Sequence, residues 1–297
     1  MMDITNSKII GEHAPHWLDH LEKQVESDTE RWPGTQVIAL LDCAFSEHCY
    51  PAIRKYRLPF RSLYDLSDRP YEALQAVSPT LIPLDLETAH AWRELLALTN
   101  GLPMLSIIVT HESLDELALR LHPWCIVDAD GQSFVFRFPD TRRLPAIVEM
   151  LAPEQHGSFF GPAQAWRYRT RFAQWADLPL PSLSCPPLER VRLDEKQCAH
   201  VIKDSEADEI IADLNLNDPA LMRRYHPADA HELIAFGLQR ADHYGIADAD
   251  RTQWCSLILQ QPKLDQLPAC APLLASLATK ERRFADIEST LSALVQT

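Results

Sequence analysis

The first half of the chain alternates between short apolar runs and stretches with helical spacing. Residues 36–41 and 104–109 are too short and too uniformly apolar for surface helices, which predicts two strands buried on both faces. Apolar positions in residues 16–26 recur at helical spacing, and residues 87–98 have a helix-forming composition that ends at Asn100-Gly101. Strands that are separated by helices predict an α/β lobe.

Local turn and cap signals extend this lobe. Ser113 precedes Glu116 by three residues, the spacing of a capping box, and predicts the start of another helix. The turn at residues 128–131 lies between an apolar run from Cys125 and the alternating residues 134–138, which predicts a β-hairpin. Because a hairpin accompanies helical crossovers, we expect a mixed sheet that is flanked by helices, with a further helix at residues 144–151.

Beyond residue 190 the pattern becomes helical. Proline residues within 178–188 interrupt regular structure, whereas helical spacing recurs from Asp194. Pro227 and Gly245 delimit one helix, and residues 250–260 and 273–295 fit others. The sequence therefore predicts an all-α C-terminal lobe. We expect three regions: residues 1–162, an α/β domain with an N-terminal helix; 163–190, a strand and a proline-rich connection; and 191–297, a helical domain.

The segment from Gln164 to Trp175 has an alternation of its own. Aromatic residues alternate with arginine, which predicts one strand with an aromatic face and a basic face. One interpretation is an edge strand whose charges prevent aggregation. The other is a docking face, because arginine and aromatic residues are concentrated at protein interfaces. The candidate partner-binding residues are Trp166, Arg167, Tyr168, Arg169, Arg171 and Phe172.

Composition narrows the classes of partner. The chain of 297 residues carries a formal net charge of −14, which opposes binding to a phosphate backbone. No stretch approaches the roughly 20 apolar residues that span a bilayer, and the N-terminus shows no signal pattern, so we expect a cytoplasmic protein. Seven cysteines without a C-x-x-C pair suggest neither a disulfide framework nor a zinc ribbon.

The usual catalytic and cofactor motifs do not occur at their required spacings. The eight glycines form neither a dinucleotide fingerprint nor a P-loop, and Phe159 stands where a nucleophile elbow between Gly157 and Gly161 needs serine. Ala235 replaces the second histidine of a metalloprotease helix that would begin at His231. We therefore expect no catalytic residue, no cofactor and no metal, and interpret the histidines and aspartates of residues 226–243 as solvated helix residues.

Six ordered segments carry a family resemblance. They are residues 39–44, 59–64, 78–82, 113–117, 130–131 with 136–140, and 159–162 with Trp166. In this order the chain resembles the effector-adaptor chaperones of the bacterial type VI secretion system, called Tap or Tec proteins, over about residues 36–166. One departure is Pro139-Asp140-Thr141, where the family has tyrosine-aspartate-proline.

The resemblance implies a non-enzymatic adaptor that binds a toxic effector protein before export and helps to load it onto the VgrG spike. It implies two protein partners, the effector and VgrG, and brings no catalytic residues. Two alternatives stay open at this point: a protein that binds another cargo, such as an immunity protein that neutralises a toxin, and an enzyme whose active-site residues are dispersed. A deep polar pocket with perturbed acids would favour the enzyme.

Overall fold

The computed structural model describes residues 8–67 and 71–295. The expectation that the N-terminus carries no signal pattern concerns in part the first seven residues, which lie outside the described residues. The chain divides into two compact units, one ending at Lys203 and the other beginning at Asp204. This division falls inside helix α8 (Glu195–Asn217), whereas the proline-rich connection lies wholly within the first unit.

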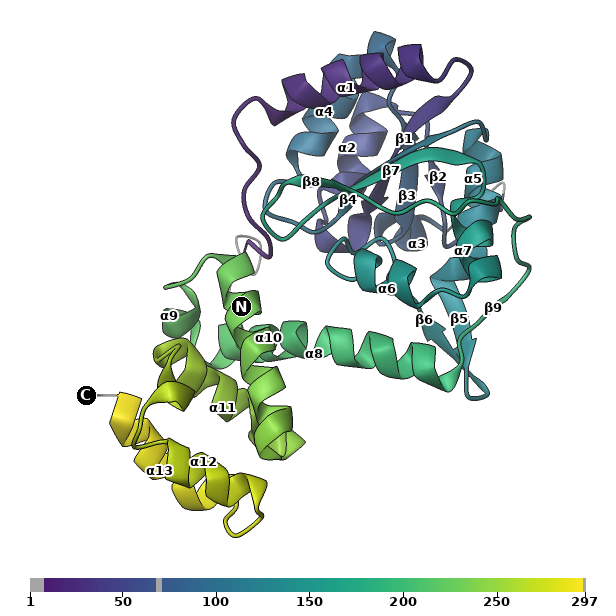
Figure 1. The fold of residues 1–297 in the computed structure, drawn as a ribbon. Coiled ribbons are helices and arrows are strands. Elements are labelled where there is room, and N and C mark those ends of the chain that lie inside the picture. The colour runs from purple at the N-terminus through teal and green to yellow at the C-terminus, as the bar shows by residue number, and fades with distance from the viewer. Residues whose placement is uncertain (1–7, 68–70, 296–297) are drawn as a thin grey trace. The chain divides into compact units, whose positions relative to one another are not determined.

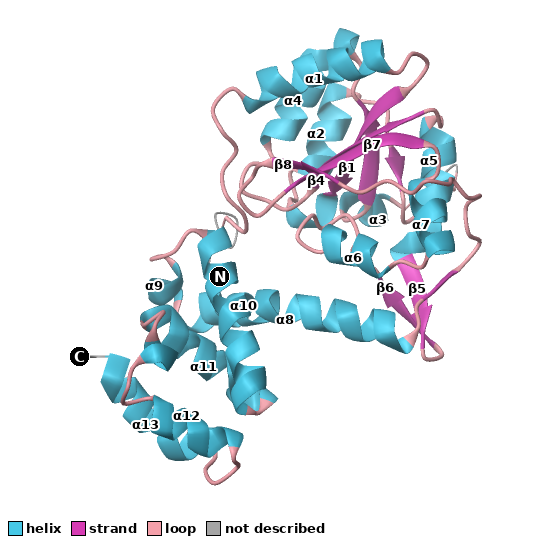
Figure 2. Ribbon diagram, in the orientation of Figure 1, coloured by secondary structure: helices cyan, strands magenta, loops and turns pink. Residues whose placement is uncertain are grey.

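The first unit is built on a six-stranded sheet with the order β2-β3-β1-β4-β7-β8. Its strands are magenta in Figure 2. The pairings of this sheet are antiparallel, and in the centre Leu40 lies opposite Leu81 on one side and Ser106 on the other. The strands are β1 (Gln36–Asp42), β2 (Arg61–Ser62), β3 (Pro79–Pro83), β4 (Leu105–Thr110), β7 (Ala163–Arg169) and β8 (Trp175–Asp177).

Helices cover both faces of the sheet (Figure 1). Alternate side chains of β1 point to opposite faces. Val37, Ala39 and Leu41 therefore pack into a core with α1 (Trp17–Arg31), α2 (Cys49–Tyr56) and α4 (Ala89–Ala97). Ile38 and Leu40 face a second core, to which the other helices contribute: α5 (Leu114–Leu121), α6 (Leu144–Met150) and α7 (Pro153–Phe160). The short helix α3 (Glu72–Ala76) precedes β3. Residues 37–41 of this run are buried on both faces of the sheet, as the sequence predicts, whereas Gln36 at the start of β1 is exposed.

A second, three-stranded sheet has the order β6-β5-β9. Strands β5 (Ile126–Ala129) and β6 (Gln132–Val135) form an antiparallel hairpin, and β9 (Val191–Arg192) pairs with β5 in parallel. Asp130 and Gly131 form the two-residue turn with positive φ angles of 49° and 73°, the conformation that an Asp-Gly turn favours. The unit therefore combines parallel and antiparallel pairing with flanking helices, and the predicted α/β fold class is confirmed.

The other local predictions for this unit agree with the structure except in the hairpin strand, at helix α7 and in the strand predicted from Gln164 to Trp175. Ser113 caps α5 and receives the backbone N–H of Glu116, while the Glu116 side chain accepts from the backbone of Ser113. The hairpin strand was expected to continue to Phe138, but β6 ends at Val135 and the next aromatic residues turn into the core. Helix α7 was not predicted, because its eight residues carry a proline and a glycine.

The second unit consists of helices, which confirms the all-α prediction for this part of the chain. Trp254 lies at its centre, fully buried, and donates from Nε1 to the Gly237 carbonyl at 2.8 Å. The segment 273–295, expected as one helix, forms two helices because Lys280 adopts a positive φ of 60°. After the part of α8 from Asp204 onward, the helices are α9 (Pro219–Met222), α10 (Pro227–Tyr244), α11 (Asp248–Gln260), α12 (Ala271–Ala278) and α13 (Phe284–Val295). None of the helices in residues 8–67 and 71–295 combines the length and the apolar composition of a membrane-spanning segment.

Candidate protein-binding surface

The strand predicted from Trp166 to Trp175 is wrong in its second half. Strand β7 ends at Arg169, the chain reverses, and β8 returns beside it. Thr170 N–H donates to the Gln174 carbonyl at 2.9 Å, and Ala173 takes a positive φ of 55° at the reversal. The turn contains none of the glycine, proline or asparagine residues that mark such reversals, so the alternation of aromatic and basic residues concealed it.

The basic face of β7 points into the protein. Arg167 forms an ion pair with Asp28 of α1, with a second contact of 2.9 Å from its other terminal nitrogen, and its Nε lies 3.3 Å from Asp177. The Asp28 carboxylate is 2% exposed and the Arg167 side chain 15%. Because β7 lies between β4 and β8, the interpretation that its arginines guard a sheet edge is wrong.

Arg169 is also buried. Its guanidinium lies between two rings, 4.7 Å from the centroid of Trp17 and 3.9 Å from that of Trp175, and donates to the Ala173 carbonyl at 2.8 Å. Burial lowers its pKa to about 10. On the opposite face Trp166 is buried and donates to Ser106 Oγ at 3.1 Å, while Tyr168 packs half-buried against the same core. Of the six candidate residues, Arg171 is half-buried and Phe172 is exposed, so their role in binding stays a prediction.

His13 is buried beside Arg169 and makes stability depend on pH. Burial and then the Arg169 charge lower its pKa to about 3, from 6.5. Because the folded state holds the neutral ring, this contribution is complete above pH 6.5 and is lost as pH falls from 6.5 towards 3. The expected loss is about 2 kcal/mol at pH 5.

Urea denaturation at pH 7 and pH 5 measures this loss. His13→Gln should flatten the pH dependence, whereas the same change at exposed His20 on α1 should leave it unaltered. An undiminished dependence in the His13 variant would show that another group is responsible.

The segments that carry the family resemblance meet inside the first unit. Ser78 Oγ receives the N–H groups of Leu63 and Tyr64, each at 3.1 Å, and thereby joins two segments. Phe159 stacks on Trp166 at 4.9 Å and meets Phe138 edge-on at 5.4 Å, which joins two more. Most of these residues therefore stabilise the fold. A binding surface of this unit would be formed by exposed residues near them.

A charged cluster lies at the end of β1. Asp42 is buried and accepts from the Arg137 guanidinium at 2.7 Å, and Arg137 stacks over the Phe45 ring at 4.6 Å. Burial raises the pKa of the Asp42 carboxyl. At residues 139–141 the sequence departs from the family pattern. The buried Asp140 carboxylate there accepts hydrogen bonds from the backbone N–H and the guanidinium of Arg142, at 3.0 and 2.7 Å. This turn therefore has a structural role.

The cysteines and the possible metal ligands are the groups that bear on a catalytic role. A nucleophilic thiol requires a lowered pKa, but a hydrogen bond with Cys49 together with burial raises the pKa of Cys43, and burial raises that of Cys125. Across the described ranges, no three His, Cys, Asp or Glu side chains are placed to hold a metal ion. His226, the first histidine of residues 226–243, is the N-cap residue of α10, and its side chain accepts a hydrogen bond from Ala228 N–H.

The most exposed strand of the unit is β6, which ends the small sheet. All four of its residues are exposed, and it contains no charge and no proline. Phe134 is 48% exposed, Val135 64%, and Ile126 opposite Val135 is 58% exposed. Proteins usually protect such edges with charge, proline or a covering segment. An uncharged apolar edge is therefore a candidate binding surface.

The pairing of the hairpin shows which backbone groups are available. Residues of an antiparallel strand direct their N–H and C=O groups alternately towards the partner strand and away from it. Phe136 N–H bonds to the Cys125 carbonyl, so Phe134 also faces β5, and the backbone groups of Ser133 and Val135 face outward. In the described part of the chain these outward groups have no hydrogen-bond partner. An added strand would pair with them.

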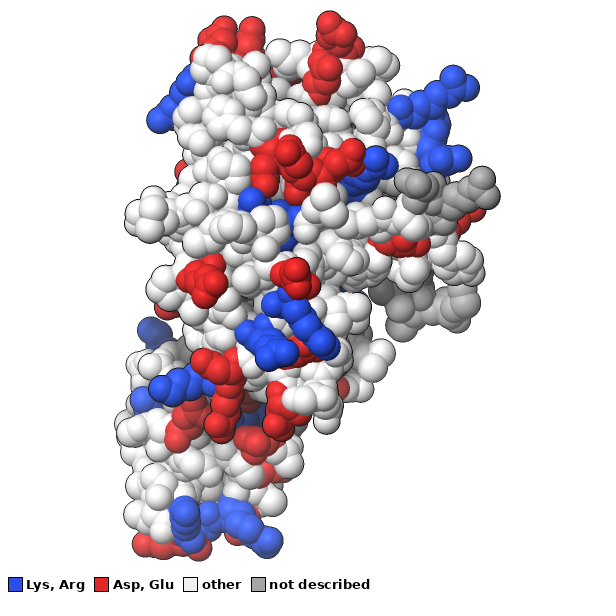
Figure 3. Space-filling view, turned by 90° about the vertical axis from the view of Figure 1, so that its right-hand side faces the viewer, with Lys and Arg blue, Asp and Glu red and all other residues white. Residues whose placement is uncertain are grey.

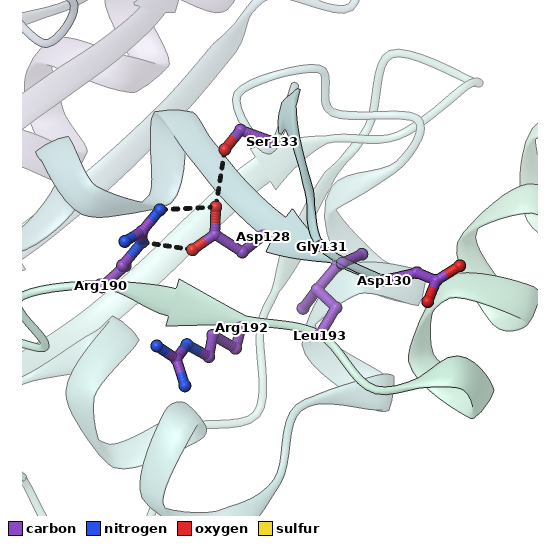
Figure 4. Close-up of a pocket in the computed structure, with 8 residues that line it drawn as sticks. Asp128, Asp130, Gly131, Ser133, Arg190, Arg192 and Leu193 are labelled. Atoms are coloured by element: carbon purple, nitrogen blue, oxygen red, sulfur yellow. Dashed lines mark hydrogen bonds and ion pairs between the residues drawn. The ribbon is translucent and has the colours of Figure 1, made fainter.

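A polar hollow of about 390 Å³ lies on the exposed face of the same sheet (Figure 4). Asp128 accepts from Ser133 Oγ at 2.7 Å and pairs with Arg190, and these two contacts lower its pKa. The charge of the exposed Arg192 also lowers the pKa of Asp128, to a smaller extent. Asp42, the buried acid whose pKa is raised, does not line this hollow. The hollow adds polar groups beside the apolar edge.

The comparisons with known proteins concern this unit. Residues 37–158 match the model of a domain of unknown function, DUF4123. The match begins in β1 and ends in α7, so it includes the β5–β6 hairpin but neither β7 nor β9. No curated protein and no solved structure matches the chain.

The sequence did not predict how short and exposed the hairpin strand β6 is. The Asp-Gly turn correctly predicted the hairpin, but the alternating residues 134–138 predicted a longer strand. Phe136 and Phe138 turn into the core, and that leaves β6 short and uncovered. The absence of charged residues from β6 was the sequence signal that could have marked this edge.

Proposed function

We propose that the chain is a non-enzymatic cytoplasmic adaptor that binds a toxic effector protein and helps to load it onto the VgrG spike of a type VI secretion system. The observation that carries the binding part of the proposal is the uncovered, uncharged edge of β6. Extended segments of partner proteins add to such edges through main-chain hydrogen bonds, and neighbouring side chains supply specificity.

The family resemblance supports the secretion part of the proposal. The residues that resemble effector adaptors extend over the same stretch that the DUF4123 model matches. In Figure 3, acidic and basic side chains are interspersed on the face shown, which suits protein recognition better than binding along a phosphate backbone. The effector and VgrG are therefore the partners we propose, with neither nucleic acid nor membrane.

A proline at position 135 tests the edge. Val135→Pro removes an outward N–H that bonds to no described residue, so the hairpin should stay paired with β5. Loss of a main-chain hydrogen bond and of strand geometry should weaken capture of the co-purified effector at least about tenfold. Affinity can be measured by surface plasmon resonance with the purified complex partners.

Leu119→Ser is the matched control, because Leu119 is a 60% exposed apolar residue on α5. It should bind the effector like the wild type. If a folded Val135→Pro variant captured the effector at full strength, the proposal that the effector binds at the β6 edge would be contradicted. Capture of a toxin with neither export nor VgrG binding would favour an immunity protein.

A further inference from the structure

A second hollow of about 640 Å³ lies in the first unit, away from the β6 edge. It is formed by the end of α6, the start of α7 and the proline-rich segment 179–185, here called the strap. Its lining is mostly apolar: Val148, Leu151, Pro153, Pro179, Pro181, Leu183 and Cys185, with Glu149, Glu154, His156 and Ser182. Hollows of this size accommodate several side chains of a ligand.

The strap is anchored and gives the hollow a preformed wall. Cys185 N–H donates to the Gly157 carbonyl at 3.0 Å, and Arg120 donates from one nitrogen to the Cys185 and Ser158 carbonyls, each at 2.9 Å. A Cβ on Gly157 would lie 2.6 Å from Cys185 Sγ, so only glycine admits the strap this closely. Preformed walls reduce the ordering cost of binding.

His156 joins the other end of the strap to α7. Its ring meets Phe160 edge-on with centroids 4.8 Å apart, and a hydrogen bond links it to the Pro179 backbone. The prolines at 179 and 181 restrict the backbone between these anchors. Both ends of the wall are therefore fixed by groups of α7.

The charge around the hollow has one sign. Glu149 and Glu154 are exposed, and in the described ranges neither carboxylate has a basic partner. The lining contains no lysine or arginine, and Leu183 is 77% exposed. An apolar floor with unpaired carboxylates is complementary to a ligand that is apolar on one side and basic on the other.

We propose that this hollow binds a basic amphipathic segment of a partner protein, with its apolar side chains against the strap and its lysine or arginine residues towards Glu149 and Glu154. A second copy of the chain is a poorer occupant, because each copy carries a formal net charge of −14. The inference adds a second contact to the proposed function, but it does not require that the partner be an effector or VgrG.

Two synthetic peptides test the proposal on the full chain. One is a fluorescein-labelled peptide of about 15 residues with leucine at i, i+3, i+4 and i+7 spacing and lysine elsewhere, and the other carries glutamate in place of lysine. The lysine peptide should bind, with an affinity that falls as salt rises, and the glutamate peptide should not. Anisotropy titrations measure both.

The variant Glu149→Lys/Glu154→Lys should weaken binding of the lysine peptide at least about tenfold, and Leu183→Asp should weaken it as well. The matched control is Glu72→Lys/Glu87→Lys, which changes the net charge equally at exposed glutamates outside the hollow. It should cost much less affinity.

Equal losses in the two double variants, or equal affinity for the two peptides, would overturn the proposal. A dimer in light scattering that Leu183→Asp dissociates would also overturn it, because a second copy would then fill the hollow. Val135→Pro should leave peptide binding unchanged. Peptide binding without a co-purified effector would contradict the proposed function alone.

Discussion

Replacing Arg167 with alanine is expected to lower the free energy of unfolding by about 3–5 kcal/mol. The substitution leaves the Asp28 carboxylate, which is 2% exposed, without its guanidinium partner between α1 and the sheet. Gln24 donates to Asp28 at 2.9 Å but supplies no charge. Urea denaturation of the full chain at pH 7, followed by circular dichroism, measures the change.

Arg190→Ala is the matched control for this ion pair. Arg190 also pairs with an aspartate, Asp128, but its side chain is 66% exposed, so its removal should cost less than about 1 kcal/mol. The double variant Asp28→Leu/Arg167→Met should recover much of the stability, because no buried charge is then left unpaired. Equal small losses for Arg167→Ala and Arg190→Ala would show that the buried pair does not hold α1 to the sheet.

Gly161→Ala is expected to destabilise the chain by about 3 kcal/mol or more. Gly161 follows α7 with φ 53° and ψ −138°, a conformation that only glycine adopts readily. A Cβ there would lie 2.2 Å from Arg120 Nε. Arg120 cannot yield without cost, because it is buried and pairs with Glu112 while holding the strap.

Gly34→Ala is the matched control, because it introduces backbone strain without a steric clash. Gly34 also has a positive φ, of 81°, but no atom lies within 4 Å of its added Cβ, so its cost should be only about 1 kcal/mol. Both variants can be compared by thermal denaturation. Similar losses at the two positions would mean that Arg120 moves freely and that the strap is not anchored through it.

Sequence patterns predicted the elements whose signals are local. The apolar run of β1, the capping box of Ser113 and the Asp-Gly turn each depend on residues within one element. Helix α7 was missed because tertiary packing, through Phe159 and Phe160 in the core, outweighs its weak helix composition.

The binding surfaces were less predictable, for a physical reason. The alternation around Arg167 correctly separated two faces of a strand, but only the packing of α1 shows that the basic face is buried. The hollow beside the strap combines residues from three separate segments between Val148 and Cys185, so no single pattern marks it. Long-range pairings of this kind leave no periodic signal in the sequence.

The most direct test of adaptor function is affinity purification of the tagged full chain from its native cells, with identification of the co-eluting proteins by mass spectrometry. The account predicts that a secreted effector co-purifies at stoichiometric amounts together with VgrG, and that effector recovery falls in the Val135→Pro variant. A chain that elutes alone, or with neither an effector nor VgrG, would contradict it.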